Sequence, residues 1–400
     1  MVSGWKKYLM FYNSNSSECI AARPCGSIYY KLFSQRTDAW PCASTIFIIM
    51  ETITALGMMS GTSLDGLDIA CCRFDVHDGR WSYEILSAET INYSDEWRQR
   101  LVQAPLLSGL ELAHLDADFG RYAGQQASEF IVRNRCKPLL VASHGHTVFH
   151  QPEQQLTLQI GHGAHLAAAS GLKVVNDFRS LDVALGGQGA PLVPIGDALL
   201  FGQYGVCLNL GGFANISYQS GHQRLASDIS PANMALNFLA RRAGKPYDKD
   251  GAMAAGGAIV HPLLEQLDAL PFYQQPAPKS LGREWFEAQM LPLIEAYDAT
   301  PADLLCTLTE HIARQVAAAA SVVPFSTLLA TGGGARNHFL MQRIGHHCQH
   351  NINIPEPLLI DYKEALVFAF LGVLRLHGSN NCLASVTGAH ADNRGGSIWG

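Results

Sequence analysis

The sequence is poor in the features that mark membrane, secreted and nucleic-acid-binding proteins. No apolar run reaches the roughly 18–20 residues that a membrane-spanning helix needs. Lys and Arg total 28 against 34 Asp and Glu, and the net charge of −6 offers no basic surface for nucleic acid or anionic lipid. None of the ten cysteines forms a CxxC pair, and their scatter favours a reducing compartment. These absences predict a cytoplasmic protein that binds neither membrane nor nucleic acid.

What the chain has is length and glycine. Its 400 residues predict about two domains, and its 37 glycines supply turns and close backbone approaches. Residues 1–49 show no sustained periodicity, whereas a strand pattern begins directly after Met50. We therefore expect Met50 to be the native start and residues 1–49 to be a disordered extension of doubtful native status.

From Met50 onward, strand and helix patterns alternate, which is typical of an α/β fold. Strands are predicted at 53–59, 67–75, 82–88, 138–143, 155–160, 172–176, 205–210, 213–219 and 327–330. Helices are predicted at 95–104, 110–135, 163–169, 231–243, 303–320, from 337 onward, and at 364–376. Each half of the chain begins with a strand, a glycine turn and a second strand, so we expect the two halves to share an architecture without a visible sequence repeat.

A first glycine turn follows the first predicted strand. Its backbone N–H groups and hydroxyls suit phosphate oxygens, and its two carboxylates are hard ligands of the kind that magnesium takes. The predicted phosphate-binding residues are Gly61, Thr62, Ser63, Leu64, Asp65, Gly66, Leu67 and Asp68, with Asp65 and Asp68 as magnesium ligands. Taken alone, the pattern fits an ordinary hairpin equally well.

Two further glycine turns lie in the second half, at Gly211-Gly212 and at Gly332-Gly333-Gly334. In this order and spacing, the three turns resemble the actin, heat-shock ATPase and sugar-kinase superfamily, which has two phosphate turns followed by an adenosine turn. The resemblance implies a two-lobed actin-like ATPase (ribonuclease H-like) α/β fold with a central cleft that binds ATP and Mg²⁺. General sugar kinases and non-catalytic nucleotide switches share this plan.

Within that superfamily, the chain from about Met50 to its end resembles the anhydro-N-acetylmuramic acid kinases. The matching stretches are GMMSGTSLDGLD (57–68), SHGHTVFHQP (143–152), NDFRSLDVALGGQGAPLVP (176–194), NLGGFAN (209–215), ATGGGARN (330–337) and EALVFAFLG (364–372). That family opens the 1,6-anhydro ring with water while ATP phosphorylates the 6-oxygen, in cell-wall amino-sugar recycling. The implied domains are an N-terminal lobe at 50–178, a C-terminal lobe at 179–376 and a segment at 377–400 returning to the first. The oligomeric state stays open, a homodimer included.

The resemblance assigns the catalytic base. The family's water-activating aspartate stands in a D-x-G-P-G-N motif, which matches DISPAN (228–233) and makes Asp228 the base, with Asn233 beside the substrate. Ser230 as N-cap and Pro231 as first helical residue would place Asp228 at a helix N-terminus, which keeps a carboxylate ionised. A capping role alone is the alternative for Asp228. Ser230 and Ala232 replace both motif glycines, so backbone geometry with φ > 0 is in question there.

Further residues are assigned to the sugar. Glu364 matches a family glutamate near the sugar and is the second predicted catalytic residue, although stabilisation of a helix N-terminus would also explain it. Asp182 is the alternative base, and Gln188 belongs to a glycine loop expected to border the sugar pocket. Arg179 is expected either to pair with the lactyl carboxylate or to bridge the lobes.

A cluster of histidines suggests a different class of protein. Five of them fall within 22 residues: His144, His146, His150, His162 and His165. Closely spaced histidines after a buried strand are one way in which metallohydrolases present zinc ligands. A zinc-dependent hydrolase leaves the three glycine turns unexplained, and the family has glutamine at position 146.

Overall fold

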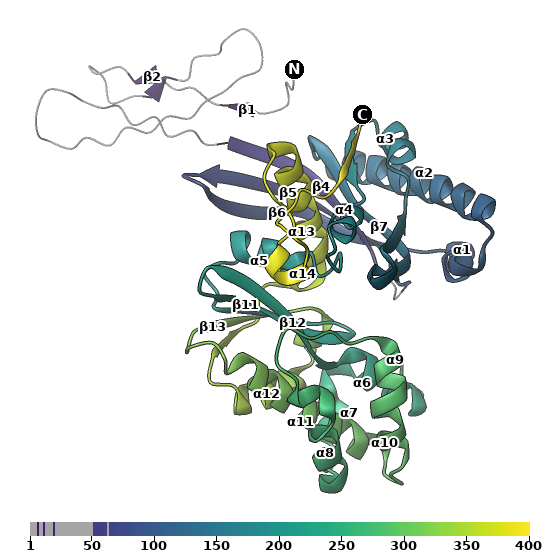
Figure 1. Ribbon diagram of the computed structural model, residues 1–400, viewed down its shortest axis with the longest axis vertical. Coiled ribbons are helices and arrows are strands. Elements are labelled where there is room, and N and C mark those ends of the chain that lie inside the picture. Colours follow the sequence, from purple (N-terminus) through teal and green to yellow (C-terminus); the bar gives the residue numbers. More distant parts are fainter. Residues whose placement is uncertain (1–5, 8–10, 13–18, 21–50, 62–63) are drawn as a thin grey trace, which may run out of the picture. The chain divides into compact units, whose positions relative to one another are not determined.

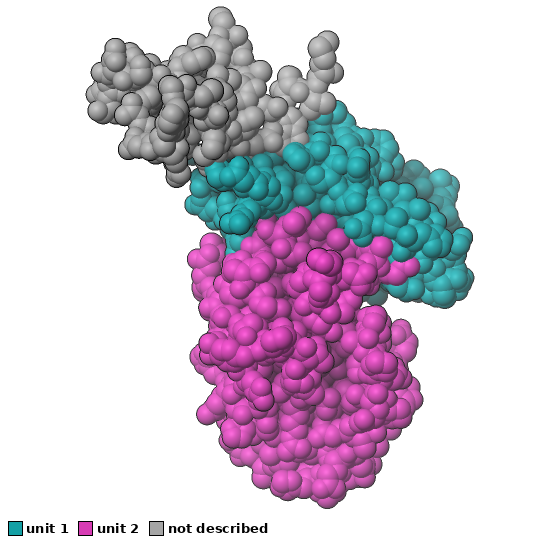
Figure 2. Space-filling view, turned by 60° about the vertical axis from the view of Figure 1, so that its left-hand side comes forward, with its two compact units in different colours: residues 1–189, 364–382, 389–400 teal, residues 190–363, 383–388 magenta. Residues whose placement is uncertain are grey.

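The computed structural model describes residues 6–7, 11–12, 19–20, 51–61 and 64–400. Its contacts divide the chain into two compact units, shown in Figure 2. Unit 1 comprises residues 1–189, 364–382 and 389–400, and unit 2 comprises residues 190–363 and 383–388. The boundaries at 189/190 and 363/364 differ from the predicted 178/179 and 376/377. Most of the expected extension at 1–49, together with Thr62 and Ser63, lies outside the described residues.

The sheet of unit 1 has the strand order β15-β9-β7-β4-β5-β6. These strands are β4 (Glu51–Ser60), β5 (Gly66–His77), β6 (Arg80–Asn92), β7 (Leu140–Gln151), β9 (Lys173–Asn176) and β15 (Ser397–Trp399). β8 (Leu156–Ile160) pairs with β7, β1 (Lys6–Lys7) pairs with β4, and β2 (Phe11–Tyr12) pairs with β3 (Cys19–Ile20). The first three long strands form an antiparallel meander, and β7 joins β4 in parallel.

Helices cover both faces of this sheet, and its central strands β5 and β7 accordingly have runs of consecutive buried residues. The helices of unit 1 are α1 (Asp95–Gln103), α2 (Gly109–Asn134), α3 (Gly163–Ser170), α4 (Ser180–Ala184) and the part of α13 (Pro357–His377) from residue 364 onward (Figure 1). Leu56 and Met58 of β4 belong to one buried cluster with Phe119 of α2. Gly57 points to the opposite face, where an added Cβ would lie 1.8 Å from the carbonyl oxygen of Ala365 in α13.

The sheet of unit 2 repeats the same plan, with the order β12-β11-β10-β13-β14. Its strands are β10 (Val206–Leu210), β11 (Phe213–Ser220), β12 (Gln223–Pro231), β13 (Thr327–Thr331) and β14 (Asn351–Asn353). Again three strands form an antiparallel meander, the next strand pairs in parallel with the first of them, and another parallel strand follows. The two sheets confirm the predicted α/β class and have the ribonuclease H-like plan of actin-like ATPases.

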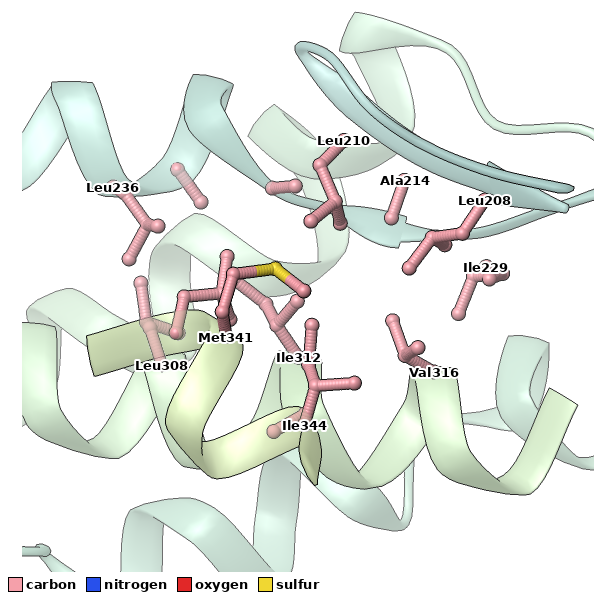
Figure 3. Close-up of a cluster of buried hydrophobic side chains, with 14 of the residues drawn as sticks. Leu208, Leu210, Ala214, Ile229, Leu236, Leu308, Ile312, Val316, Met341 and Ile344 are labelled. Carbon is pink, nitrogen blue, oxygen red and sulfur yellow. The ribbon is translucent and has the colours of Figure 1, made fainter. Parts of the chain in front are cut away.

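The core of unit 2 lies between this sheet and α11. The helices are α5 (Val193–Leu200), α6 (Asn233–Arg242), α7 (Ala252–Ala255), α8 (His261–Asp268), α9 (Arg283–Trp285), α10 (Leu291–Glu295), α11 (Pro301–Ala320), α12 (His338–His347), α14 (Ala384–Thr387) and the start of α13. Leu308, Ile312 and Val316 recur at the predicted spacing of four on α11 and are buried with Leu208 and Leu210 of β10 (Figure 3). Within the described residues, no helix is both long enough and apolar enough to cross a membrane.

Short helical turns complete the chain. The 3₁₀ turns are Ala104–Leu106, Pro152–Gln154, Lys249–Gly251, Pro271–Gln274 and Gly333–Arg336, and Phe286–Met290 forms a π turn. Helix α13 begins at residue 357, seven residues before the predicted start, and is kinked at Tyr362, whose φ of −116° and ψ of 17° are not helical. The chain passes from unit 2 to unit 1 directly after this kink, between Lys363 and Glu364.

Strand β12 is the main element that the sequence pattern missed. It pairs with β11 along its whole length, from Gln223 to Pro231. Its buried positions do not alternate, because both faces of the strand are partly covered, so no period of two is visible in the sequence. β14 and β15 have only three residues each, too few for any periodicity to appear.

Candidate active site

The first glycine turn of unit 1 connects β4 to β5. Leu64 has a left-handed φ of 60°, and its N–H donates to the carbonyl of Gly61 at 3.3 Å. Asp65 is exposed, and Asp68 on β5 accepts a hydrogen bond from the hydroxyl of Thr90 at 2.6 Å. Asp65 and Asp68 thus lie on the turn and at the start of β5, and their assignment to magnesium stays a prediction.

The structure gives no support to a zinc site at the histidine cluster. In the described part of the chain, no group of three or more His, Cys, Asp or Glu side chains could hold a metal ion. The Nε2 atom of His144 accepts from Nε of Arg179 at 3.0 Å, and a guanidinium can only donate. The Nδ1 atom of His146 lies 2.9 Å from Oγ of Ser60. These ring nitrogens serve the protein's own hydrogen bonds.

Asp182 is a buried carboxylate that organises the predicted sugar loop. Its side chain is fully buried. Its two oxygens accept from the N–H of Gly189 at 2.8 Å, from Nδ2 of Asn393 at 2.7 Å and from Sγ of Cys382 at 3.0 Å. Because three donors from unit 1 already bind this group, its surroundings suit a structural role better than that of the alternative base.

The loop at 186–189 presents one side chain to solvent. Gly186 and Gly189 have φ values of 82° and 66°, a region that favours glycine. A Cβ on Gly187 would lie 2.2 Å from Oδ2 of Asp182. Gln188 is exposed between two buried glycines. The glycines thus shape the loop, and Gln188 is the residue that can meet a ligand.

Arg179 is bound within unit 1. Its Nη1 donates to the carbonyl of Gly189 at 2.6 Å, and its Nε and Nη2 lie 3.0 and 2.9 Å from Nε2 of His144. Burial lowers the pKa of Arg179 to about 10, and the negative charge of Glu364 acts in the opposite direction. Glu364 itself is exposed at the start of the unit 1 part of α13. The charges of Arg179 and Glu364 therefore interact, and Arg179 also binds the backbone of the loop at 186–189.

The second and third glycine turns lie side by side in unit 2. Nδ2 of Asn233 donates to the carbonyl of Leu210, immediately before the second turn, at 3.0 Å. Gly332 has a φ of 81°, and its Cβ would lie 2.6 Å from Oδ1 of Asn209. A Cβ on Gly334 would lie 2.7 Å from Cβ of Leu210. The strand end at 209–210 therefore contacts the third turn directly, and two of the three predicted turns converge.

The glycines of the second turn are not required by packing. A Cβ on Gly212 would meet nothing within 4 Å, and one on Gly211 would meet its first atom at 3.5 Å. Neither residue has a positive φ. The space beside both glycines is open, which leaves their backbone accessible to phosphate oxygens.

This open space leads to a test at Gly212. Gly212→Ala should leave the free energy of unfolding within about 0.5 kcal/mol, because the new methyl group has room. The affinity for ATP should fall about tenfold, since the methyl group occupies the space of the ligand. Calorimetric titration with ATP and chemical denaturation measure the two quantities. Gly109→Ala, at another open position, should change neither; unchanged ATP affinity in Gly212→Ala would remove the second turn from the nucleotide site.

Asp228 is held in the interior of β12. Its N–H donates to the carbonyl of Lys279 at 2.9 Å, and its Oδ2 accepts from the N–H of Leu281 at 2.8 Å. Burial raises the pKa of Asp228, and the hydrogen bond from Leu281 partly opposes this. The carboxylate is fixed in direction by this hydrogen bond and is only partly exposed.

The predicted helix terminus at Asp228 is wrong. The N-cap of α6 is Ala232, which has no side chain able to cap, and Ser230 is buried in β12. Pro231 is the last residue of the strand rather than the first of the helix. The strand continues because it pairs with β11 to its end, so burial rather than a helix terminus sets the pKa of Asp228.

The two residues that replace the motif glycines are accommodated. Neither Ser230 nor Ala232 has a positive φ, so the question raised by the missing glycines is answered for the backbone. Oγ of Ser230 lies 3.2 Å from the hydroxyl of Tyr273. The contacts of Asp228 with Lys279 and Leu281 were missed in the sequence, because backbone groups carry no side-chain signal.

Comparisons with known proteins agree with these motifs. The model of the anhydro-N-acetylmuramic acid kinase family matches residues 53–400. A relative from Rhodopseudomonas palustris named anhydro-N-acetylmuramic acid kinase is 36% identical over 370 residues, covering 86% of this chain and 98% of its own. One of the same name from Pseudomonas putida is 38% identical over 360 residues, covering 84% and 96%. A solved ROK family glucokinase from Streptomyces griseus is 14% identical, covering 80% of this chain and 98% of its own with a TM-score of 0.35.

Proposed function

The chain belongs to the anhydro-N-acetylmuramic acid kinase family, and we propose that it opens 1,6-anhydro-N-acetylmuramic acid with water while transferring a phosphoryl group from ATP to the 6-oxygen. The product is N-acetylmuramic acid 6-phosphate, and the role is recycling of cell-wall amino sugars in the cytoplasm. The observation that carries the proposal is Asp228, a half-buried carboxylate in the same unit as two convergent glycine turns.

Each unit, taken by itself, carries a turn that we assign to the nucleotide. In unit 2, Gly211 and Gly212 offer backbone to phosphate oxygens, and the turn at 332–334 offers backbone to adenosine. In unit 1, the turn at 61–68 adds the carboxylates of Asp65 and Asp68 for Mg²⁺, which commonly takes one or two carboxylates together with phosphate oxygens. When bound, ATP and Mg²⁺ supply the phosphoryl group and neutralise its developing charge.

Asp228 acts as the general base. It accepts a proton from a water molecule whose oxygen attacks the anomeric carbon of the sugar. The bond from that carbon to the 6-oxygen breaks, and the 6-oxygen takes the phosphoryl group. Because Leu281 N–H binds one oxygen of the carboxylate, the group keeps one orientation toward its water. The raised pKa makes the carboxylate a stronger base than an exposed aspartate.

Each unit carries residues that we assign to the sugar. Glu364 and Gln188 are exposed, and we assign them direct contacts with the substrate. Asn233 contributes from unit 2, where it already joins the second and third turns. Arg179 and Asp182 shape the pocket through the loop at 186–189, whose backbone they bind on both sides of Gly189.

A coupled ADP-release assay tests the function. We expect ADP release that depends on anhydro-N-acetylmuramic acid, with a product heavier than the substrate by one water and one phosphoryl group. Activity on ordinary hexoses alone would make the protein a general sugar kinase. Intact ATP binding without sugar-dependent ADP release would favour a nucleotide switch, and stoichiometric zinc in the purified protein would revive the hydrolase.

A further inference from the structure

Ser60 is the last residue of β4, directly before the first phosphate turn, and its hydroxyl is held from two sides. The hydroxyl of Tyr93 donates to Oγ of Ser60 at 2.7 Å, and Oγ lies 2.9 Å from Nδ1 of His146. Ser60 and His146 are only 1% and 4% exposed. Since Oγ already accepts from Tyr93, the serine proton is directed to Nδ1 of a neutral His146. Burial, which lowers the pKa of His146 to about 4, keeps the ring in that form.

The side chain of His144 is linked to the sugar loop at 186–189 through Arg179. Its Nε2 accepts from Arg179, which in turn donates to the carbonyl of Gly189 at 2.6 Å. A guanidinium cannot accept, so the proton of the neutral ring must be on Nδ1, which lies 2.9 Å from the carbonyl of Gly145. Burial lowers the pKa of His144 well below its ordinary value, in agreement with a neutral ring.

The residue between the two histidines fixes their backbone. Gly145 has a left-handed φ of 75°, and a Cβ there would lie 2.6 Å from the carbonyl oxygen of Ile160 in β8. The β4–β7 ladder shifts its register between Met58 and Ser60, which brings Ser60 opposite His146. The three-residue segment at 144–146 is thus a defined structure, in which the side chain of His146 contacts Oγ of Ser60 and the side chain of His144 contacts both Arg179 and the backbone of Ser60.

We propose that His146 and His144 are positioning residues that hold, respectively, the first phosphate turn through Ser60 and the sugar loop through Arg179. In a zinc site, the side chains of His144 and His146 would be metal ligands. In the proposal, the segment at 144–146 instead sets the spacing of two substrate-binding elements within unit 1. This inference rests on the proposed kinase function and adds residues that do not touch either substrate.

The two histidines should have separable kinetic effects in the full-length protein. His146→Leu should raise KM for ATP about tenfold and leave KM for the sugar within about twofold, since one buried hydrogen bond to the turn is lost. His144→Leu should raise KM for the sugar about tenfold and KM for ATP by a smaller factor, because His144 contacts Arg179 and also the backbone of Ser60. Glutamine offers an acceptor oxygen in either place, so His146→Gln and His144→Gln should recover most of the lost affinity.

A purely structural role predicts a different outcome. It would lower the thermal midpoint and the active fraction while both KM values stay at those of the wild type, and that result would overturn the proposal. Where a leucine variant fails to fold, two other variants test the same contacts. Tyr93→Phe removes the hydrogen bond from Tyr93 to Ser60, and Arg179→Lys disrupts the contacts of Arg179 with His144 and Gly189. Tyr93→Phe should raise KM for ATP, and Arg179→Lys should raise KM for the sugar. Equal changes of both KM values in these variants would also overturn the proposal. Absence of sugar-dependent ADP release in the wild type would reject the proposed kinase function itself. Failure of the positioning role and failure of the kinase function are therefore distinguishable.

Discussion

Replacing Asp228 with asparagine should lower the turnover of anhydro-N-acetylmuramic acid about a thousandfold, because a general base typically contributes a factor of about 10²–10⁴. The amide oxygen can still accept from Leu281 N–H, so the side chain keeps its place in β12. The affinity for ATP should stay within about threefold, since the loss falls on the chemical step. Steady-state ADP release and calorimetric ATP titration measure the two quantities.

Asp298→Asn is the matched control, because Asp298 is an exposed aspartate of the same unit. It should behave as the wild type. Near-normal turnover in Asp228→Asn would mean that another group activates the water, and the surroundings of Asp182 make that residue a poor replacement.

The same carboxylate sets a pH dependence. The proposed reaction uses its deprotonated form, and burial raises the pKa of Asp228 above the ordinary 3.8. The ratio kcat/KM should therefore fall as the pH drops through a midpoint above 3.8, and this acid limb belongs to the free enzyme. An acid limb at or below 3.8 would contradict the burial of Asp228 as the cause.

Gly57→Ala should lower the free energy of unfolding by about 3 kcal/mol, at the upper end of the usual cost of overpacking. The new methyl group would lie 1.8 Å from the carbonyl oxygen of Ala365 and 2.8 Å from the backbone nitrogen of Ala369. Helix backbone cannot rotate away as a side chain can, so α13 must move off β4. Denaturation followed by tryptophan fluorescence suits this test, because the ring of Trp81 lies 5.1 Å from that of Phe370 on α13.

Gly109→Ala provides the comparison for this variant. An added Cβ there meets nothing within 4 Å, and the residue opens α2. Its stability should stay at or slightly above that of the wild type, because alanine is the better helix former. Equal stability of the two variants would show that α13 can be displaced from β4 at little cost.

The elements predicted from the sequence are those that end at a glycine or whose apolar residues recur at a regular spacing. The strands around the first turn and the apolar face of α11 belong to this group, since Gly61 ends one pattern and Leu308, Ile312 and Val316 repeat every four residues. Family motifs named Asp228, Asn233 and the glycine turns as candidate site residues, and these assignments stay predictions. These features are local, and local features are visible in a single sequence.

What the sequence could not predict depends on partners far along the chain. The N–H that orients Asp228 comes from Leu281, 53 positions later, and the acceptor for Ser60 is His146, 86 positions later. The surroundings of Asp228 were misjudged because Ser230 and Pro231 are good helix-start residues, yet pairing with β11 keeps them in a strand. The histidine pair shows the same limit, since spacing alone cannot tell a metal ligand from an acceptor for arginine.

Unit 1 is formed by segments that unit 2 separates in the sequence, and this order has a consequence for biosynthesis. One face of β4 and β7 is covered by α13, where Cβ atoms on Gly57 and Gly372 would strike the opposing element. That helix comes from residues 364–377, which leave the ribosome only after residues 190–363 of unit 2 have been made. Unit 2 can thus fold while the first sheet still has an apolar face exposed, so a nascent chain paused near residue 363 should be a strong substrate for chaperones.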